Sequence, residues 1–412
     1  MSKTETCDIA IIGAGPAGAV SAAILAEKGW KVRVFERQHF PRFSIGESML
    51  CQTMQLLKEV GLYDDVKAAG FQYKDGASFA WGNRYTDVYF PNKSAPGIDT
   101  TFQVRREQFD IVLIEAAKKR GAKVTFGDTV TAFDSDDKGA TLTVKSEDGS
   151  TTEVKARFVL DGSGFGRVLP RLLNLELAST FDKRRSVYTH VNDHADVSTY
   201  DRNKILVTIN PEEPQIWYWM IPLADGLTSI GIVGPDDAIS SAGATPQERL
   251  DALLPRAELQ SSILKNATPA RVAGEIIGFA ANVKSLTGPS YALLGNAAEF
   301  LDPVFSSGVT IAMKSAVLAS DLVDKHLKGQ PVDWQKDFAD ELKVGVEAFR
   351  ACVASWYDGS LQRIIFDRPM ADTKVTSYIT SLLAGYAWDR ENPIVREPTR
   401  FLKVIDQLCQ PA

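Results

Sequence analysis

The chain begins with a glycine-rich turn that could hold the pyrophosphate of a dinucleotide. The segment CDIAIIGAGPAG, residues 7–18, runs from an apolar stretch into the pattern G-x-G-x-x-G. Gly13 permits a tight turn, Gly15 lets the backbone approach a pyrophosphate, and Gly18 allows a helix to pack closely. The following helix, which includes Ala17, offers N–H groups and the positive end of its dipole. The turn is therefore a candidate dinucleotide site.

A carboxylate stands where such a site needs one. The segment KVRVFE predicts a second strand that ends at Glu36, which is followed directly by Arg37. An acid about 20 residues after the glycine turn can bind ribose hydroxyls. Because strand, turn, helix, strand and terminal acid coincide, the sequence predicts a βαβ dinucleotide unit rather than a simple glycine turn.

Two later stretches carry side chains that could do chemistry or shape a site. In GFQYKDGASFAW, residues 70–81, the single cation Lys74 lies among aromatic and small residues. The segment IWYWMIP contains the pattern W-x-W-x-I-P, formed by Trp217, Trp219, Ile221 and Pro222. A desolvated lysine has a depressed pKa and can supply a neutral amine, and alternate residues of a strand share one face. Alone, these stretches would be read as a surface lysine and as sheet packing.

Three further segments, far apart in sequence, could complete the site. RREQFD precedes an amphipathic helix, FVLDGSG ends an apolar strand at Asp161, and LLGNAAEFLDP leads into a long helix. A βαβ unit alone holds only the ADP half of FAD, so contributions from distant segments indicate FAD rather than a nicotinamide.

These segments together resemble the flavoprotein monooxygenase family over nearly the whole chain. The resemblance implies that Glu36 binds ribose and that Arg106 lies along the FAD. The other cofactor-binding residues that it implies are Asp161, Asn296 and Pro303. Asn296 replaces the aspartate of the family's usual GDA motif, so it can bind a ribityl hydroxyl only without a charge.

Two motifs are similar to the signatures of flavin-dependent halogenases. One is the W-x-W-x-I-P segment, and the other is F-x-x-P-x-x-S-x-G, present in FLDPVFSSG as Phe300, Pro303, Ser306 and Gly308. The resemblance implies that the tryptophans deny an organic substrate access to the flavin while a small anion can enter. Ser307 and Gly308, at a helix N-terminus, are the implied halide-binding residues.

The segment around Lys74 resembles the lysine-bearing stretch of halogenases that act on phenols and pyrroles. In that family reduced FAD and oxygen convert halide into hypohalous acid, which travels through a tunnel to the lysine. Lys74 would hydrogen-bond this acid or carry the halogen as a haloamine. Phe305 stands where tryptophan-acting members have a glutamate, which favours the phenol and pyrrole branch. Glu47 and Asp75 are candidate general bases, on sequence proximity alone.

The fold expected from these resemblances and patterns is α/β, in three parts. A Rossmann-like, glutathione-reductase-type FAD-binding domain comprises residues 1–75, 100–180 and 275–330. An inserted antiparallel sheet on the substrate side comprises residues 76–99 and 181–274, where short apolar runs alternate with turns. Residues 331–412, with apolar residues at spacings of three and four, form a C-terminal helical region.

Composition narrows the function classes. The chain has 412 residues, 44% hydrophobic and 24% charged, with a net charge of −6, which disfavours nucleic-acid binding. The four cysteines show no metal-ligand spacing and the four histidines no ligand pattern, so we expect a reduced cytoplasmic chain and no bound metal. We expect neither a signal peptide nor a membrane span, since no apolar run reaches 18 residues.

The expected activity is FAD-dependent halogenation of an electron-rich aromatic substrate, free or tethered to a carrier protein, with chloride or bromide as co-substrate. No second glycine-rich unit for a nicotinamide is apparent. A separate flavin reductase is therefore the expected source of reduced FAD. The alternatives are an FAD monooxygenase or a geranylgeranyl-reductase-like oxidoreductase, and a noncatalytic flavin-binding protein.

Overall fold

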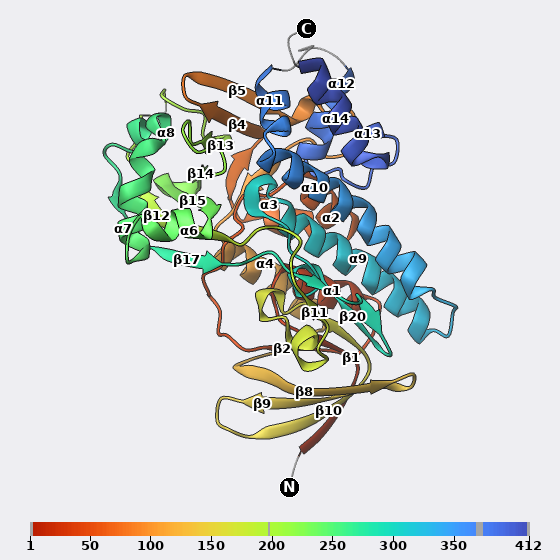
Figure 1. Ribbon diagram of the computed structural model, residues 1–412. Helices are drawn as coiled ribbons and strands as arrows, with labels where there is room; N and C mark the ends of the chain where they lie inside the picture. Colours follow the sequence, from red (N-terminus) through yellow and green to blue (C-terminus); the bar gives the residue numbers. More distant parts are fainter. Residues whose placement is uncertain (1–2, 197, 368–373, 410–412) are drawn as a thin grey trace.

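The computed structural model describes residues 3–196, 198–367 and 374–409 (Figure 1). Its first sheet has the strand order β19-β20-β10-β1-β2-β7, with β8 and β9 continuing antiparallel from β10. The strands of this sheet are β1 (Lys3–Ile12), β2 (Val32–Glu36), β7 (Lys123–Phe126), β8 (Asp128–Asp136), β9 (Gly139–Ser146), β10 (Thr151–Asp161), β19 (Thr287–Gly288) and β20 (Tyr291–Leu293). The pairs β10–β1, β1–β2 and β2–β7 are parallel.

The parallel core follows from the sequence of β1 and of the next helix. Ile9 and Ile11 are fully buried, as expected for a central parallel strand covered on both faces. Helix α1 (Pro16–Glu27) is rich in alanine and packs against both α4 (Arg106–Lys119) and α9 (Ser307–Leu327). Small side chains allow this close packing, so the glycine turn before α1 is held firmly.

The second sheet has the order β16-β12-β15-β14-β13-β4-β5, and β17 pairs with β12. Its strands are β4 (Gly76–Trp81), β5 (Arg84–Tyr89), β12 (Arg184–Asn192), β13 (Lys204–Ile209), β14 (Trp217–Pro222), β15 (Leu227–Pro235), β16 (Thr268–Pro269) and β17 (Gly274–Ile277). The sheet is antiparallel except between β4 and β13, which run parallel because β4 enters from an earlier part of the chain. Two short ribbons lie outside these sheets, β3 (Gln72–Lys74) with β6 (Thr101–Gln103), and β11 (Glu176–Leu177) with β18 (Asn282–Val283).

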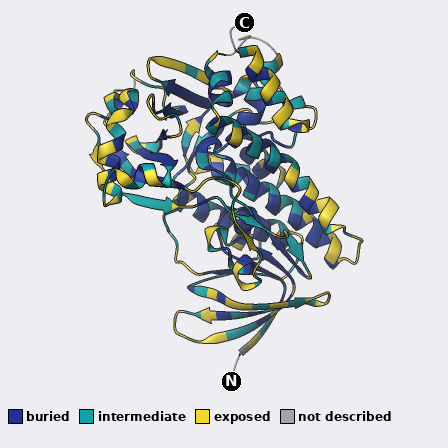
Figure 2. Ribbon diagram, in the orientation of Figure 1, coloured by how far each residue is buried: buried dark blue, intermediate teal, exposed yellow. Residues whose placement is uncertain are grey.

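Helices surround both sheets. Besides α1 and α4, the α-helices before residue 300 are α2 (Cys51–Glu59), α3 (Tyr63–Ala68), α5 (Val168–Leu172), α6 (Asp236–Ser241), α7 (Pro246–Leu253) and α8 (Glu258–Ile263). After α9 follow a π-helical segment (Trp334–Asp340), α10 (Glu341–Tyr357), α11 (Ser360–Asp367), α12 (Lys374–Leu383), α13 (Pro393–Arg396) and α14 (Pro398–Cys409). Figure 2 shows buried residues gathered where the helices meet the two sheets, with exposed residues frequent on β8–β10.

The expected fold class is confirmed, with a Rossmann-like sheet, a largely antiparallel second sheet and C-terminal helices. The strands of the first sheet lie in residues 1–75, 100–180 and 275–330. The ribbon that carries Lys74 was not expected, and β17 crosses the expected boundary after residue 274. Among the described residues, no helix combines the length and apolarity needed to cross a membrane, and no group of His, Cys, Asp and Glu is placed to hold a metal ion.

Candidate active site

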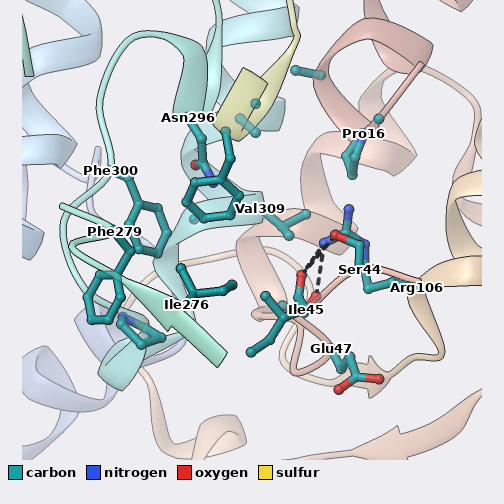
Figure 3. Close-up of a pocket in the computed structure, with 18 of the residues that line it drawn as sticks. Pro16, Ser44, Ile45, Glu47, Arg106, Ile276, Phe279, Asn296, Phe300 and Val309 are labelled. Carbon is teal, nitrogen blue, oxygen red and sulfur yellow. Dashed lines mark hydrogen bonds between the residues drawn. The ribbon is translucent and has the colours of Figure 1, made fainter. Parts of the chain in front are cut away.

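One cavity is lined by residues of both the first sheet and the second. At one end it is lined by the glycine turn and the end of β2, namely Gly13, Gly15, Pro16, Ala17, Glu36 and Arg37. We call this the nucleotide end. At the other it is lined largely by aromatic and aliphatic side chains, namely Phe43, Trp217, Trp219, Ile276, Phe279 and Phe300. We call this the aromatic end. Figure 3 shows Pro16 and Arg106 across the cavity from Ile276, Phe279 and Phe300.

The backbone of the nucleotide end has room for a ligand. Gly13 has φ +90°, in the left-handed region, and a Cβ there would lie 2.7 Å from the Gly162 oxygen. A Cβ on Gly15 would meet only Arg42 Nη2, at 3.4 Å, because this face of the turn opens onto the cavity. Glu36 is buried, and its two carboxylate oxygens accept from the N–H groups of Ala14 (2.8 Å) and Gln38 (2.9 Å).

Two of the expected cofactor-binding residues lie behind the cavity wall rather than on it. A Cβ on Gly18 would come within 2.0 Å of the Gly13 oxygen, so Gly18 serves the packing of α1. The Asp161 carboxylate is fully buried and accepts from the N–H groups of Ser163 (2.9 Å) and Leu169 (2.7 Å). Burial raises the pKa of Asp161. It therefore shapes the turn from Gly162 to Gly166, which does line the cavity.

An arginine pair joins α4 to the loop between β2 and α2, residues 37–50, here called the β2–α2 loop. Arg106 binds both oxygens of Asp110 (2.9 and 3.1 Å) and donates to the Ile45 oxygen (2.7 Å). Arg42 Nη2 also contacts Asp110, at 3.2 Å, while its buried Nε has no partner among the described residues. Both arginines line the cavity, so each brings a positive charge to its wall.

The glycine-serine loop and Asn296 form the middle of the cavity wall. Ser306 has φ 54°, a left-handed conformation, and stands just before the first residue of α9. Ser306, Gly308, Pro303 and Asn296 line the cavity. Ser307, named from the sequence as a halide ligand, is buried and is not among the lining residues. Ser306 and Gly308 are thus the loop residues that face a ligand.

The tryptophan strand β14 presents Trp217, Trp219 and Ile221 to the cavity, whereas Pro222 does not line it. The two indole rings lie 6.0 Å apart and are inclined by 46°. Trp219 Nε1 donates to Ser229 Oγ (3.1 Å), and a Cβ on Gly231 would collide with the Trp219 ring at 2.3 Å. Gly231 on the neighbouring strand β15 therefore leaves the space that the Trp219 indole occupies.

A buried hydrogen-bond chain fixes the other indole. Trp217 Nε1 donates to the Tyr357 hydroxyl (3.0 Å), which donates to Asp302 Oδ2 (2.8 Å). Asp302 Oδ1 accepts from the Val304 N–H (2.9 Å), and the Arg184 guanidinium lies 3.3 Å from the Tyr357 ring centroid. Burial raises the pKa of Asp302 to about 6 and that of Tyr357 well above its usual value. The part of the cavity lining formed by Trp217 and Trp219 is here called the tryptophan wall. The C-terminal helix α10 supports it through Tyr357, which the sequence did not reveal.

Lys74 is buried, with 1% of its surface exposed. Its Nζ donates to Ser48 Oγ (2.7 Å) and to the Met49 oxygen (2.9 Å), and lies 5.2 Å from the Phe90 ring centroid. Desolvation lowers the pKa of Lys74 from 10.5 to about 7, since in the described part of the chain no carboxylate forms an ion pair with it. Lys74 itself does not line the cavity; Ser48 does, and is one hydrogen bond away.

The two candidate bases are separated by the structure. Glu47 lines the cavity and forms a 2.8 Å contact with His190 Nε2. Asp75 forms a 3.3 Å ion pair with Lys204 and does not line the cavity. Sequence reasoning missed His190 because it lies on β12, more than a hundred residues from the β2–α2 loop. Ser48 lay within the SIGES segment but carried no distinguishing signal.

The chain is similar to known flavoproteins and to halogenating enzymes. The FAD binding domain family matches residues 6–339. The chain is 28% identical to the 1H-pyrrole-2-carbonyl-[peptidyl-carrier protein] chlorinase of Pseudomonas fluorescens, over 85% of this chain and 82% of that one. It is 26% identical to the corresponding brominase of Pseudoalteromonas luteoviolacea, over 99% and 98% of the two chains.

Among solved structures, a protein described as a flavoprotein/dehydrogenase from Cytophaga hutchinsonii superposes with a TM-score of 0.94. It is 38% identical and the match covers 98% of this chain and 99% of that one. The expected resemblance is confirmed. The chain belongs to the FAD binding domain family, and along nearly its whole length it is similar to flavin-dependent halogenases.

Proposed function

We propose that the protein is a flavin-dependent halogenase that uses reduced FAD, oxygen and chloride or bromide to halogenate an electron-rich phenolic or pyrrolic ring. The observation that carries this proposal is the convergence of two halogenase motifs on the FAD cavity. The indoles of Trp217 and Trp219 and the loop with Ser306 and Gly308 line the same space as the glycine turn. These segments lie up to 295 residues apart in the sequence, so their proximity in sequence does not explain why both motifs line the same cavity.

The residues would divide the work between the two ends of the cavity. Gly13, Gly15, Glu36 and Arg42 would bind the ADP half of FAD, and Asn296 its ribityl chain. Bound reduced FAD supplies the electrons with which oxygen and a proton turn halide into hypohalous acid and water. The buried tryptophan wall keeps a ring-sized substrate from the flavin, while Ser306 and Gly308 offer a polar seat for the anion.

Lys74 suits the transfer of halogen because it is buried and lacks a carboxylate partner. With a pKa of about 7 it is present in both protonation states near neutral pH. The ammonium form can polarise hypohalous acid, and the neutral form can accept halogen as a haloamine. Ser48 Oγ, on the cavity wall and 2.7 Å from Nζ, would meet the acid first and pass it on.

The first experiment needs no substrate. FAD-loaded protein is reduced without oxygen, then mixed with oxygenated buffer with and without bromide, in the presence of catalase and a dye that traps hypobromite. We expect brominated dye only when protein and bromide are both present. Hydrogen peroxide as the sole product, at a rate that bromide does not change, would contradict the halogenase function.

Lys74→Ala separates the lysine from the flavin chemistry. We expect this variant to retain FAD and to form hypobromite, while halogenation of a phenol at the enzyme falls about 100-fold or more, the range of a lost acid–base or nucleophilic group. Lys204→Ala is the matched control, because Lys204 starts a neighbouring strand but is paired with Asp75 and Asp201. Retained activity in Lys74→Ala would exclude its catalytic role.

A second candidate is an FAD-dependent oxidoreductase that acts directly on an organic substrate. The similarity to a flavoprotein/dehydrogenase favours it, and so does the position of Lys74 behind Ser48 rather than on the cavity wall. Substrate-triggered flavin oxidation in the complete absence of halide would support this candidate.

We also propose that a separate flavin reductase supplies the reduced cofactor and that the protein works in the cytoplasm. All four cysteines are free thiols, and three of them are buried. The substrate would be a small aromatic compound, free or tethered to a carrier protein, as the names of the two halogenating relatives suggest.

A further inference from the structure

A buried glutamate on the wall of the cavity, Glu47, is paired with the partly buried His190 behind it, and neither is needed to bind FAD or to hold halide. Glu47 belongs to the β2–α2 loop of the FAD domain, and His190 to β12 of the second sheet. His190 Nε2 lies 2.8 Å from Glu47 Oε1. Glu47 is 2% exposed overall, so its carboxyl group is held out of bulk water. Burying a carboxylate is costly unless it is used or well paired.

Only half of the Glu47 carboxylate is engaged. Oε1 contacts His190, and Oε2 has no hydrogen bond within the part of the chain that the structure describes. The backbone of Glu47 is fixed because its oxygen accepts from the Val104 N–H at 2.7 Å. Glu47 lines the cavity, and Figure 3 shows its side chain extending away from Arg106 and Ser44. One oxygen is therefore left for a ligand.

The surroundings of this pair suit a flat aromatic ring. Phe43 lines the cavity, meets the His190 ring edge-on at 5.5 Å, and stacks on Tyr188 at 5.8 Å with an interplanar angle of 17°. The Arg271 guanidinium lies 3.5 Å from the Phe43 ring centroid. Phe43 is thus held rigidly by its neighbours, and its ring can guide a planar substrate toward the Glu47 carboxylate.

We propose that Glu47, oriented by His190, is the proton acceptor for the ionisable O–H or N–H of the aromatic substrate. This inference rests on the proposed function, since it assigns the substrate end of the same cavity. Glu47 is then a catalytic residue that touches substrate, and His190 is a positioning residue. The substrate class follows from the chemistry: an aromatic ring with a hydrogen-bond donor attached to it or within it.

The proton and electron balance of this step closes with the reagents already named. The O–H or N–H donates to Glu47, which raises the electron density of the ring. A ring carbon then forms a bond to the halogen of hypohalous acid as the O–halogen bond breaks and hydroxide leaves. The ring C–H proton is lost, the heteroatom recovers its proton from the pair, and hydroxide with the ring proton makes water.

The chain contains a second His–Glu pair with the same chemistry in a different setting. His39 Nε2 lies 2.9 Å from Glu147 Oε2, but both side chains are more than 60% exposed and neither lines the cavity. That pair can only link two surface segments. It provides a matched control, because replacing Glu147 removes the same type of contact without touching the cavity.

The test compares two probes that differ by one proton donor, 4-methylphenol, whose hydroxyl stays protonated at neutral pH, and 4-methylanisole. Their binding to the FAD-loaded, oxidised enzyme is measured by calorimetry for the wild type, Glu47→Gln and Glu147→Gln. We expect the wild type and Glu147→Gln to prefer the phenol by about 10- to 100-fold, the range of a hydrogen bond to a charged acceptor. In Glu47→Gln the preference should fall to about one- to threefold, because an amide oxygen is a weaker acceptor than a carboxylate.

Replacing His190 provides a second variant that does not depend on how Glu47→Gln folds. His190→Gln keeps an N–H that can reach Glu47 and should retain most of the phenol preference, whereas His190→Ala should lose it with FAD content unchanged. If His190 had only a structural role, His190→Ala would weaken the binding of both probes equally. An unchanged preference in Glu47→Gln, or a wild type that fails to distinguish the probes or binds neither, would overturn the proposal.

The two proposals can fail separately. If the wild type forms no bromide-dependent oxidant, the halogenase function fails, whatever the probe preference. If it forms the oxidant but shows no preference for the phenol, Glu47 is not the proton acceptor and the halogenase function stands.

Discussion

At the nucleotide end of the cavity the ligand faces backbone of residues that are close in sequence, whereas at the aromatic end it faces side chains from many strands. The first end depends on absent side chains, as the close contacts of a Cβ at Gly13 and Gly18 show. The second depends on buried polar groups, among them Lys74, Glu47 and Asp302. Substitutions at the nucleotide end should therefore act through steric conflict. Substitutions at the aromatic end should act through the charge and protonation of buried groups.

The largest effect should come from the pH dependence of stability at Lys74. Because the pKa of Lys74 is lowered from 10.5 to about 7, the unfolded chain binds a proton between these values that the folded chain lacks. The free energy of unfolding should therefore rise with pH across this window, by about 5 kcal/mol in total at 1.36 kcal/mol per unit. Below about pH 7 this contribution is absent.

Lys74→Met isolates this contribution, since it keeps the length of the side chain and removes the charge. Denaturant midpoints of both proteins are measured from pH 6 to 9, and the difference between them cancels the titration of the cysteines and tyrosines. We expect the wild type to gain about 2 kcal/mol relative to the variant between pH 7 and 9. If the stabilities of the wild type and Lys74→Met changed with pH in parallel, Lys74 would remain charged in the folded protein.

Two glycine substitutions test whether the nucleotide end is steric. A Cβ on Gly18 would lie 2.0 Å from the Gly13 oxygen, so Gly18→Ala should destabilise the FAD-free protein by about 3 kcal/mol, the upper range for overpacking. Gly15→Ala meets only Arg42 Nη2 at 3.4 Å and should leave that stability within about 1 kcal/mol while weakening FAD binding. Thermal unfolding and flavin titration check both, and equal effects of the two on stability would contradict the distinction.

The contrast between the two ends also explains which parts of the fold and of the site can be predicted from the sequence. The glycine turn, Glu36 and the two halogenase motifs are local patterns with a fixed meaning, so the fold class and the FAD cavity followed from them. That Ser306 and Gly308 line the cavity and Ser307 does not could not be read from the motif, because it depends on the left-handed conformation of Ser306. His190 and Tyr357 could not be found, since only the packing of β12 and α10 brings them into contact with Glu47 and Trp217, which line the cavity.

Asp302 should show a pH effect of opposite sign to that of Lys74. Burial raises its pKa from 3.8 to about 6, so the folded chain holds a proton between these values that the unfolded chain has lost. Stability should fall as pH rises from about 4 to about 6, by about 3 kcal/mol. Asp302→Asn removes the ionisation, and denaturant midpoints from pH 4 to 7 should show the variant gaining on the wild type by this amount. An unchanged difference across that range would place the folded pKa near 4.

The smallest effect should come from Tyr357→Phe, which keeps the ring and removes one hydroxyl. The change deprives the Trp217 N–H of its acceptor and Asp302 of a donor, at a cost of about 2 kcal/mol, because a buried group without a partner costs about 1–3 kcal/mol. A freed Trp217 indole should let the wall between flavin and substrate loosen. More of the oxygen consumed should then appear as hydrogen peroxide than as trapped hypobromite, while FAD content stays unchanged.

Phe338→Leu, at a buried position in the π-helical segment away from the cavity lining, is the control for stability loss alone. If both variants shift the peroxide yield equally, Tyr357 acts only through stability, and the aromatic end does not depend on the hydrogen bond from α10.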